Sequence, residues 1–117
     1  MAMNQDCIFC KIIAGEAESV RIWEDEDFIA IKNKFPEAPV DVLVMPKQHF
    51  EKRDLWENSP ANIKTNGQLI VATYEVIKLL GLDKKGFRLI INGAGYNHLE
   101  HEHVHVLGEL KNPKSNV

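Results

Sequence analysis

The sequence lacks the features that would place it in a membrane or on a polyanion. No apolar run reaches the ~18 residues that a membrane-spanning helix needs. The N-terminus has neither the basic nor the apolar region of a secretory signal, so we expect a cytoplasmic location. The net charge of −3 argues against broad binding to polyanions. We therefore expect no nucleic-acid partner and no membrane partner.

Cysteine is scarce, and its two residues, Cys7 and Cys10, stand in C-x-x-C spacing. In a reducing compartment such a pair is more often a metal or redox site than a structural disulfide. Two thiolates at this spacing supply half of a tetrahedral zinc shell. The alternative interpretation is a pair of reduced, buried cysteines.

Internal repeats and low-complexity segments are also missing. The length of 117 residues and the 44% share of hydrophobic residues fit one globular domain with one core. We place this domain at residues 1–110 and predict a polar C-terminal tail over residues 111–117.

The order of the expected elements predicts an α+β sheet with a long helix on one face. Asp6 is a candidate cap for a short helix over residues 7–14. Ser59 and Pro60 predict the start of the long helix, which Gly81 ends. Its expected buried stripe is Ile63, Gly67, Ile70, Tyr74 and Ile77. The expected strands are residues 20–23, 28–32, 40–45, 87–91 and 102–110.

Three of the five histidines alternate in the run His101, His103 and His105. A β-strand turns this period of two into a single face, with neighbours about 6.5–7 Å apart along the strand. Three neutral, unpaired imidazoles on one surface need a chemical reason. Either they hold a metal, or one imidazole attacks a phosphorus-centred electrophile while its neighbours orient it.

The histidine row and four segments before it resemble the histidine-triad family. These segments are residues 7–13, 36–39, 43–49 and 92–93, in the same order as in the family. The resemblance covers about residues 7–110 and implies an α+β fold: a five-stranded antiparallel sheet with one long and one short helix. It also implies a homodimer and nucleotidyl hydrolase or transferase activity on purine nucleoside phosphoramidates or dinucleoside polyphosphates.

By this resemblance, His103 is the nucleophile and forms a covalent nucleotidyl-histidine that water hydrolyses, without a metal in the chemical step. An acceptor must hold the far nitrogen of its ring, so that the near nitrogen carries the lone pair. His105 would orient and bind the phosphate oxygens. His101 completes the catalytic set.

The resemblance further implies a site for a purine nucleotide. An apolar slot would hold the base, and polar side chains would contact the ribose, the phosphates and the leaving group. The expected residues are Ile8, Phe9, Ile12 and Ile31 for the slot, Asn33 for the ribose, and Asn92, Asn97 and His98 for the phosphate side. Ordinary core packing is the alternative interpretation of the apolar members.

In the bacterial branch of the family, His49 and His101 would complete the shell begun by Cys7 and Cys10. Four protein ligands leave no open position for water, so this zinc would be structural.

Some residues depart from the family pattern. Asn33 replaces an aspartate, Asp41 a histidine, Tyr96 a glycine, His98 a small hydroxyl or acidic residue, and Glu102 an apolar residue. These departures keep two other hypotheses open. One is a non-catalytic nucleotide-binding or scaffold protein with the same fold. The other is a catalytic metal site on the histidine row, with Asp41 as an extra ligand.

Overall fold

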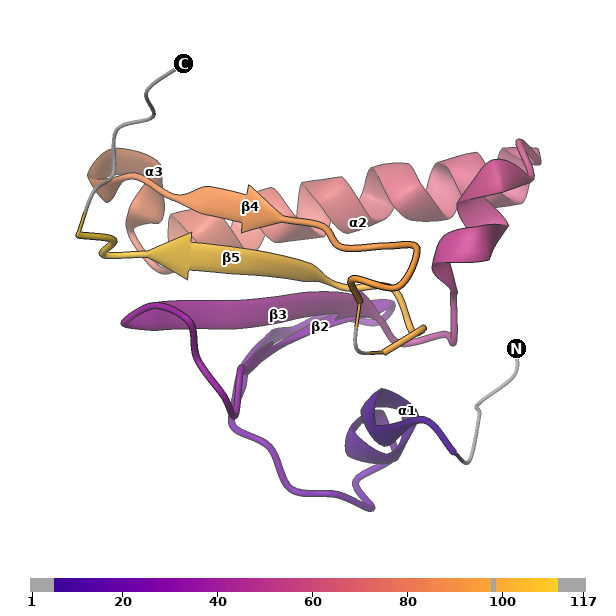
Figure 1. Ribbon diagram of the computed structural model, residues 1–117, viewed down its shortest axis with the longest axis horizontal. Helices are drawn as coiled ribbons and strands as arrows, with labels where there is room; N and C mark the ends of the chain where they lie inside the picture. The colour runs from indigo at the N-terminus through magenta and orange to yellow at the C-terminus, as the bar shows by residue number, and fades with distance from the viewer. Residues whose placement is uncertain (1–5, 98, 112–117) are drawn as a thin grey trace.

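A five-stranded antiparallel sheet with the strand order β1-β2-β3-β5-β4 forms the centre of the molecule (Figure 1). The structure is a computed structural model and describes residues 6–97 and 99–111. The strands are β1 (Arg21–Glu24), β2 (Phe28–Lys32), β3 (Val40–Pro46), β4 (Arg88–Ile90) and β5 (Val104–Gly108). The helices are α1 (Ile8–Ile13), α2 (Pro60–Leu79), α3 (Leu82–Lys85) and the 3₁₀ helix η1 (Lys52–Trp56). The predicted α+β class is confirmed.

The sheet has a separate apolar core on each face, because successive side chains of a strand point to opposite sides. Helix α2 covers one face and α1 the other (Figure 1). The core on the α2 side includes Phe28, Ala30, Val42, Val44, Val104 and Val106 of the sheet. The core on the α1 side joins Ile29, Ile31, Leu43 and Met45 to Cys7, Phe9, Cys10 and Ile12. Since Val104 and Val106 face α2, His105 between them faces α1.

Helix α2 begins as the sequence predicts. The Ser59 hydroxyl accepts a hydrogen bond from the Asn62 N–H at 3.1 Å, and Pro60 is the first helical residue. The predicted buried stripe is confirmed at Ile77 but is wrong at Ile63 and Tyr74. The buried residues of α2 are Leu69, Ala72, Thr73, Val76 and Ile77, whereas Ile63 and Tyr74 are exposed. Residues 69–80 carry apolar side chains all round the helix, so the period alone does not fix the buried face.

Two local predictions also need correction, and two short helices were missed. Cys7, not Asp6, is the N-cap of α1, and its Sγ accepts from the Cys10 N–H at 3.4 Å. Strand β5 begins at Val104, two residues later than expected, because the Glu102 N–H bonds to the Phe50 carbonyl outside the sheet. The short helices α3 and η1 were not predicted.

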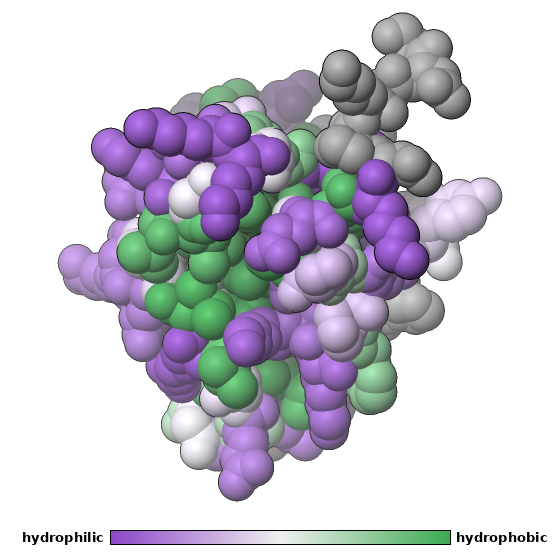
Figure 2. Space-filling model, turned by 90° about the vertical axis from the view of Figure 1, so that its left-hand side faces the viewer, coloured by the Kyte–Doolittle hydropathy of each residue, from purple (hydrophilic) through white to green (hydrophobic). Residues whose placement is uncertain are grey.

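Gly81 joins α2 to α3 with a φ of 73°, a left-handed conformation that favours glycine. At this end of the molecule, apolar side chains reach the surface between hydrophilic ones (Figure 2).

Across residues 6–97 and 99–111, the structure has no helix with the length and apolar character to cross a membrane. Residues 112–117 of the predicted tail, and His98, lie outside the described residues.

Candidate functional site

The three histidines of the row stay on one side of the molecule, although only His105 lies within β5. His101 forms an isolated bridge with Glu51. The Phe9 ring of α1 contacts His101 and His103 edge-on, with centroid distances of 5.7 and 5.1 Å. The rings of His103 and His105 lie 5.2 Å apart. The row therefore lines the space between the sheet and α1.

His103 has one ring nitrogen held by the backbone. Its Nδ1 lies 2.8 Å from the carbonyl oxygen of His101. A carbonyl only accepts hydrogen bonds, so Nδ1 carries the proton and the neutral ring has its lone pair on Nε2. This is the arrangement that a nucleophilic imidazole needs. The sequence predicts the need for an acceptor but does not identify the carbonyl that provides it.

Four side chains converge at the first histidine of the row: Cys7, Cys10, His49 and His101 itself. Their candidate ligand atoms all lie within 4.8 Å of one another. Cys7 Sγ lies 3.4 Å from His101 Nδ1, and Cys10 Sγ lies 3.4 Å from His49 Nδ1. A tetrahedral zinc with ordinary bond lengths places sulfur and nitrogen ligands about 3.5 Å apart. The four predicted ligands are together, at separations that fit a Cys₂His₂ metal site.

Both histidines of this Cys₂His₂ cluster have their other nitrogen bound. His49 Nε2 lies 2.6 Å from the Glu51 carboxylate, and His101 Nε2 lies 2.7 Å from the Pro46 carbonyl. Such partners fix the ring orientation of metal-binding histidines. Burial lowers the pKa of His101 to about 4, against the opposing effect of its bond to Pro46. The ring is therefore neutral at pH 7, which is the form that binds metal.

Glu51 is a site residue that sequence reasoning missed. It lies two residues after His49, and in an extended segment this spacing puts both side chains on one side. The His-x-Glu pattern was therefore the available signal. The Pro46 carbonyl had no such signal, since a backbone acceptor leaves no mark on the sequence.

Asp41 lies at the other end of the row. Its side chain has no exposed surface. Oδ2 accepts hydrogen bonds from Asn33 Nδ2 at 2.9 Å and from the Glu37 N–H at 3.0 Å. Oδ1 lies 3.4 Å from His105 Nδ1. Asp41 and His105 are diagonal neighbours, because β3 and β5 pair Asp41 with Leu107 and Leu43 with His105.

The apolar residues expected to hold a base occupy two environments. Phe9, Ile12 and Ile31 are buried in the core on the α1 side. Ile8 is 42% exposed on the outside of α1. Ile8 is thus the member of this set that offers substantial surface to a ligand.

The polar residues expected to contact a nucleotide have different surroundings, and Asn33 is the one connected to the row, through Asp41. Asn33 donates to Asp41, and its Oδ1 accepts from the Phe35 N–H. Asn92 lies half-buried just after β4. Asn97 bonds within its own loop, accepting from the Gly95 N–H and donating to the Leu99 carbonyl.

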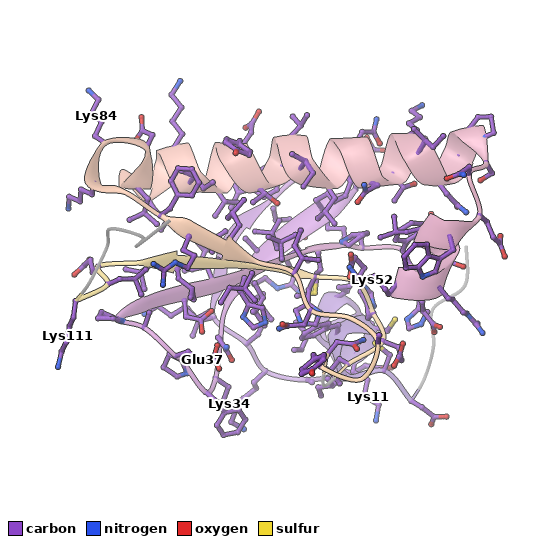
Figure 3. The ribbon with its side chains drawn as sticks, turned by 45° about the horizontal axis from the view of Figure 1, so that its top comes forward. Lys11, Lys34, Glu37, Lys52, Lys84 and Lys111 are labelled. Atoms are coloured by element: carbon purple, nitrogen blue, oxygen red, sulfur yellow. The ribbon has the colours of Figure 1, made fainter. Side chains whose placement is uncertain are left out.

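A second feature that the sequence did not predict is an ion pair beneath this loop. Lys52 Nζ lies 2.7 Å from the Glu102 carboxylate, and the Glu102 side chain is 5% exposed. A Cβ added at Gly93 would lie 3.2 Å from Lys52 Cε, so the loop after β4 passes close over this lysine. Lys52 extends from η1 toward that loop (Figure 3).

Comparisons with known proteins match the chain almost end to end. The HIT domain family matches residues 14–112. Protein HitA of Neisseria gonorrhoeae is 33% identical over 105 residues, covering 88% of this chain and 95% of that protein. A 14 kDa zinc-binding protein of Brassica juncea is 35% identical over 105 residues, covering 88% and 92%.

Solved structures also match the chain almost end to end. A HIT family hydrolase from Clostridium thermocellum superposes with a TM-score of 0.84 at 35% identity, covering 97% of this chain and 99% of that one. A histidine triad protein from Clostridium difficile has a TM-score of 0.83 at 33% identity, covering 99% and 100%. The sequence matches and the shared fold agree: the chain belongs to the HIT domain family.

Proposed function

We propose that the chain is a nucleotidyl hydrolase or transferase that forms a covalent nucleotidyl intermediate on His103. Its substrates would be purine nucleoside phosphoramidates or dinucleoside polyphosphates. The observation that carries the proposal is the 2.8 Å contact between His103 Nδ1 and the His101 carbonyl, which leaves the lone pair on Nε2. Membership of the HIT domain family, and the likeness to a HIT family hydrolase, support it.

The reaction has two steps at phosphorus. His103 Nε2 attacks, a nitrogen–phosphorus bond forms, and the leaving group departs with the electron pair of the bond that breaks. Water then attacks the same phosphorus, and the His103 ring leaves as the nucleotide is released. A covalent intermediate of this kind divides one high barrier into two lower ones. His105 would bind and orient the phosphate oxygens. Its ring centroid lies 5.2 Å from the ring centroid of His103.

The nucleotide would lie along the α1 side of the row. Ile8 would contact the base at the edge of the core formed by Phe9, Ile12 and Ile31. Asn33 would bind the ribose through the second N–H of Nδ2 and the second lone pair of Oδ1, because one N–H bonds to Asp41 and one lone pair accepts from the Phe35 N–H. The phosphate side would include Asn92, Asn97 and His98.

We also propose that Cys7, Cys10, His49 and His101 hold a zinc ion with a structural role. The separations within the Cys₂His₂ cluster support this, and so does a relative named as a zinc-binding protein. A bound zinc would close a four-ligand shell and tie α1 to the segment after β3, through His49, and to the row itself, through His101. The chemical step would use the imidazoles alone.

The resemblance to the histidine-triad family leads us to propose a homodimer, and we also propose that it works in the cytoplasm. Its partner would be the purine nucleotide. The net charge of −3 supports the absence of a nucleic-acid partner.

The decisive variant is His103→Ala. We expect it to lose hydrolysis of an adenosine phosphoramidate by several orders of magnitude, because no other imidazole among residues 6–97 and 99–111 has the same placement, while its thermal melting stays close to that of the wild type. Intact-mass measurement after a brief substrate pulse should detect a nucleotidylated wild-type chain and no adduct on the variant. Lys64→Ala, on the exposed side of α2, is the matched surface control.

Two results would contradict the proposal. One is unchanged turnover in His103→Ala. The other is calorimetric binding of the nucleotide by the wild type without any product on chromatography, which would indicate a binding or scaffold protein.

A further inference from the structure

We propose that Asp41 is a positioning residue for His105: it fixes which ring nitrogen His105 presents to the substrate phosphate. This inference rests on the proposed function. Asp41 departs from the family pattern, and the inference gives this residue a role in the site.

The burial of Asp41 is the first observation. A carboxylate whose side chain has no exposed surface is costly unless it is paired and hydrogen-bonded. Asn33 and the Glu37 backbone donate to Oδ2, at 2.9 and 3.0 Å. These two donors come from the segment that joins β2 to β3, so they hold the carboxylate in one orientation. Oδ1 is directed at His105 as a result.

The second observation is the tautomer that this contact imposes. An ionised carboxylate only accepts, so Nδ1 of His105 carries a proton. Nε2, on the far side of the ring, then holds either the lone pair or a second proton. The charge of a doubly protonated ring is balanced by Asp41, so His105 can present a charge-assisted N–H to a phosphate oxygen. The 3.4 Å separation is long, as it often is before substrate binds.

The groups around His105 leave one competing explanation. Glu37, Asp41 and His105 have candidate ligand atoms within 4.8 Å of one another, which could suit a metal ion. Glu37 lies in the exposed loop before β3 (Figure 3). Oδ2 of Asp41 already accepts two N–H groups, so Asp41 can offer a metal only Oδ1. That same Oδ1 lies 3.4 Å from His105 Nδ1, a separation that an imidazole N–H satisfies without an ion.

The Asp41→Asn variant should change the tautomer of His105. The two donors that face Oδ2 require an acceptor, so the new amide oxygen must take that position. The amide NH₂ then faces His105 Nδ1, which must become the acceptor. The ring changes to its Nε2–H tautomer and loses the balancing charge. An aspartate-to-asparagine change beside the catalytic histidine of the serine-protease triad has this effect.

The experiment reads the tautomer directly by long-range ¹H–¹⁵N NMR of the imidazoles in the purified protein, at a pH where the His105 ring is neutral. His105→Asn identifies the signal by its loss. We expect the Nδ1–H tautomer in the wild type and the Nε2–H tautomer in Asp41→Asn. In parallel, kcat for an adenosine phosphoramidate should fall about 10- to 100-fold in Asp41→Asn, with a smaller change in KM. Glu75→Gln, the same change on the exposed side of α2, should match the wild type.

Three outcomes would overturn the inference. The first is an Nε2–H tautomer in the wild type, which needs no variant and so remains decisive even if Asp41→Asn does not fold. The second is a wild-type kcat in a folded Asp41→Asn. The third is an equal loss in Glu37→Gln, which would indicate the metal. None of these three outcomes would contradict the proposed function, which is contradicted instead if His103→Ala stays active.

Discussion

At the scale of single residues, each histidine of the row has one ring nitrogen bound to an acceptor. His101 Nε2 faces the Pro46 carbonyl, His103 Nδ1 faces the His101 carbonyl, and His105 Nδ1 faces Asp41. These contacts determine where the second ring nitrogen of each histidine is directed. Nδ1 of His101 faces the cysteine sulfur atoms, and Nε2 of His103 and of His105 is the nitrogen available to a ligand of the site. Three identical side chains thus acquire different chemistry from their partners alone.

The buried ion pair gives a prediction at this scale. Lys52→Met removes the cation beside Glu102, whose side chain is 5% exposed, and leaves that carboxylate without its counter-charge. Lys52 itself is partly exposed, so we expect the free energy of unfolding to fall by about 1–3 kcal/mol, below the range for a fully buried pair. Urea denaturation measures it.

The double variant Lys52→Met/Glu102→Gln is the matched test of the charge, since neither member is then ionised. It should recover much of the loss. Lys64→Met, at an exposed position of α2, should stay within about 0.5 kcal/mol of the wild type. A Lys52→Met variant as stable as this control would show that the pair contributes nothing.

Candidate residues were visible in the sequence where side chains carry a pattern. The alternating histidines and the C-x-x-C pair stood out by their spacing, and the family resemblance selected His103 and added His49 and His101 to the two cysteines that the structure brings together. The acceptors were not predictable, because two of them are backbone carbonyls. Asp41 was visible as a departure from the family and as an extra ligand of a possible metal site, but not as a partner of His105. Its contact with His105 depends on the register between β3 and β5, which no local pattern specifies.

At the scale of elements, strands were easier to predict than the buried face of a helix. β3 is buried on both sides and reads as a nearly unbroken apolar run, with Asp41 as its exception. In α2 the apolar residues surround the helix, so the face that packs on the sheet is chosen by tertiary contacts. The start of β5 was misplaced for a similar reason. His101 and Glu102 pair with the segment at Phe50 and Glu51, which is distant in sequence.

Packing of α3 on the end of β5 yields a prediction for Gly108. A Cβ at this position would lie 2.7 Å from Leu82 Cδ2 and 3.3 Å from Val40 Cβ. Leu82 is 1% exposed, so its methyl groups have little room to move. We expect Gly108→Ala to lower the free energy of unfolding by about 1–3 kcal/mol through overpacking. Thermal and urea denaturation measure the change.

Gly67 offers the matched control, because a Cβ there meets nothing within 4 Å. Gly67→Ala places a better helix former inside α2, so its stability should rise by about 0.5–1 kcal/mol. The two glycine-to-alanine changes should therefore have opposite signs. A stabilising effect of Gly108→Ala would refute the close packing of α3 on β5.

At the scale of the whole molecule, the two faces of the sheet are held in different ways. The α2 face is covered by a 20-residue helix with a continuous apolar core. The α1 face is covered by a helix of six residues, which is too short to be stable alone. Its attachment depends on Phe9, Ile12 and the two cysteines. A metal in the Cys₂His₂ cluster would therefore stabilise the weaker layer in particular.

Metal removal should consequently affect one layer first. We expect a strong chelator to lower the melting temperature on the order of 10 °C, since a ligand at a thousandfold excess over its Kd contributes about 4 kcal/mol to a domain of this size. Amide hydrogen exchange should accelerate across α1 before it changes in β3 or α2. Cys10→Ser should show the same exchange pattern without chelator, and added zinc should reverse the effect in the wild type alone. Uniform acceleration in all elements would mean that the cluster supports the whole fold, and an unchanged exchange pattern would mean that it holds no structural metal.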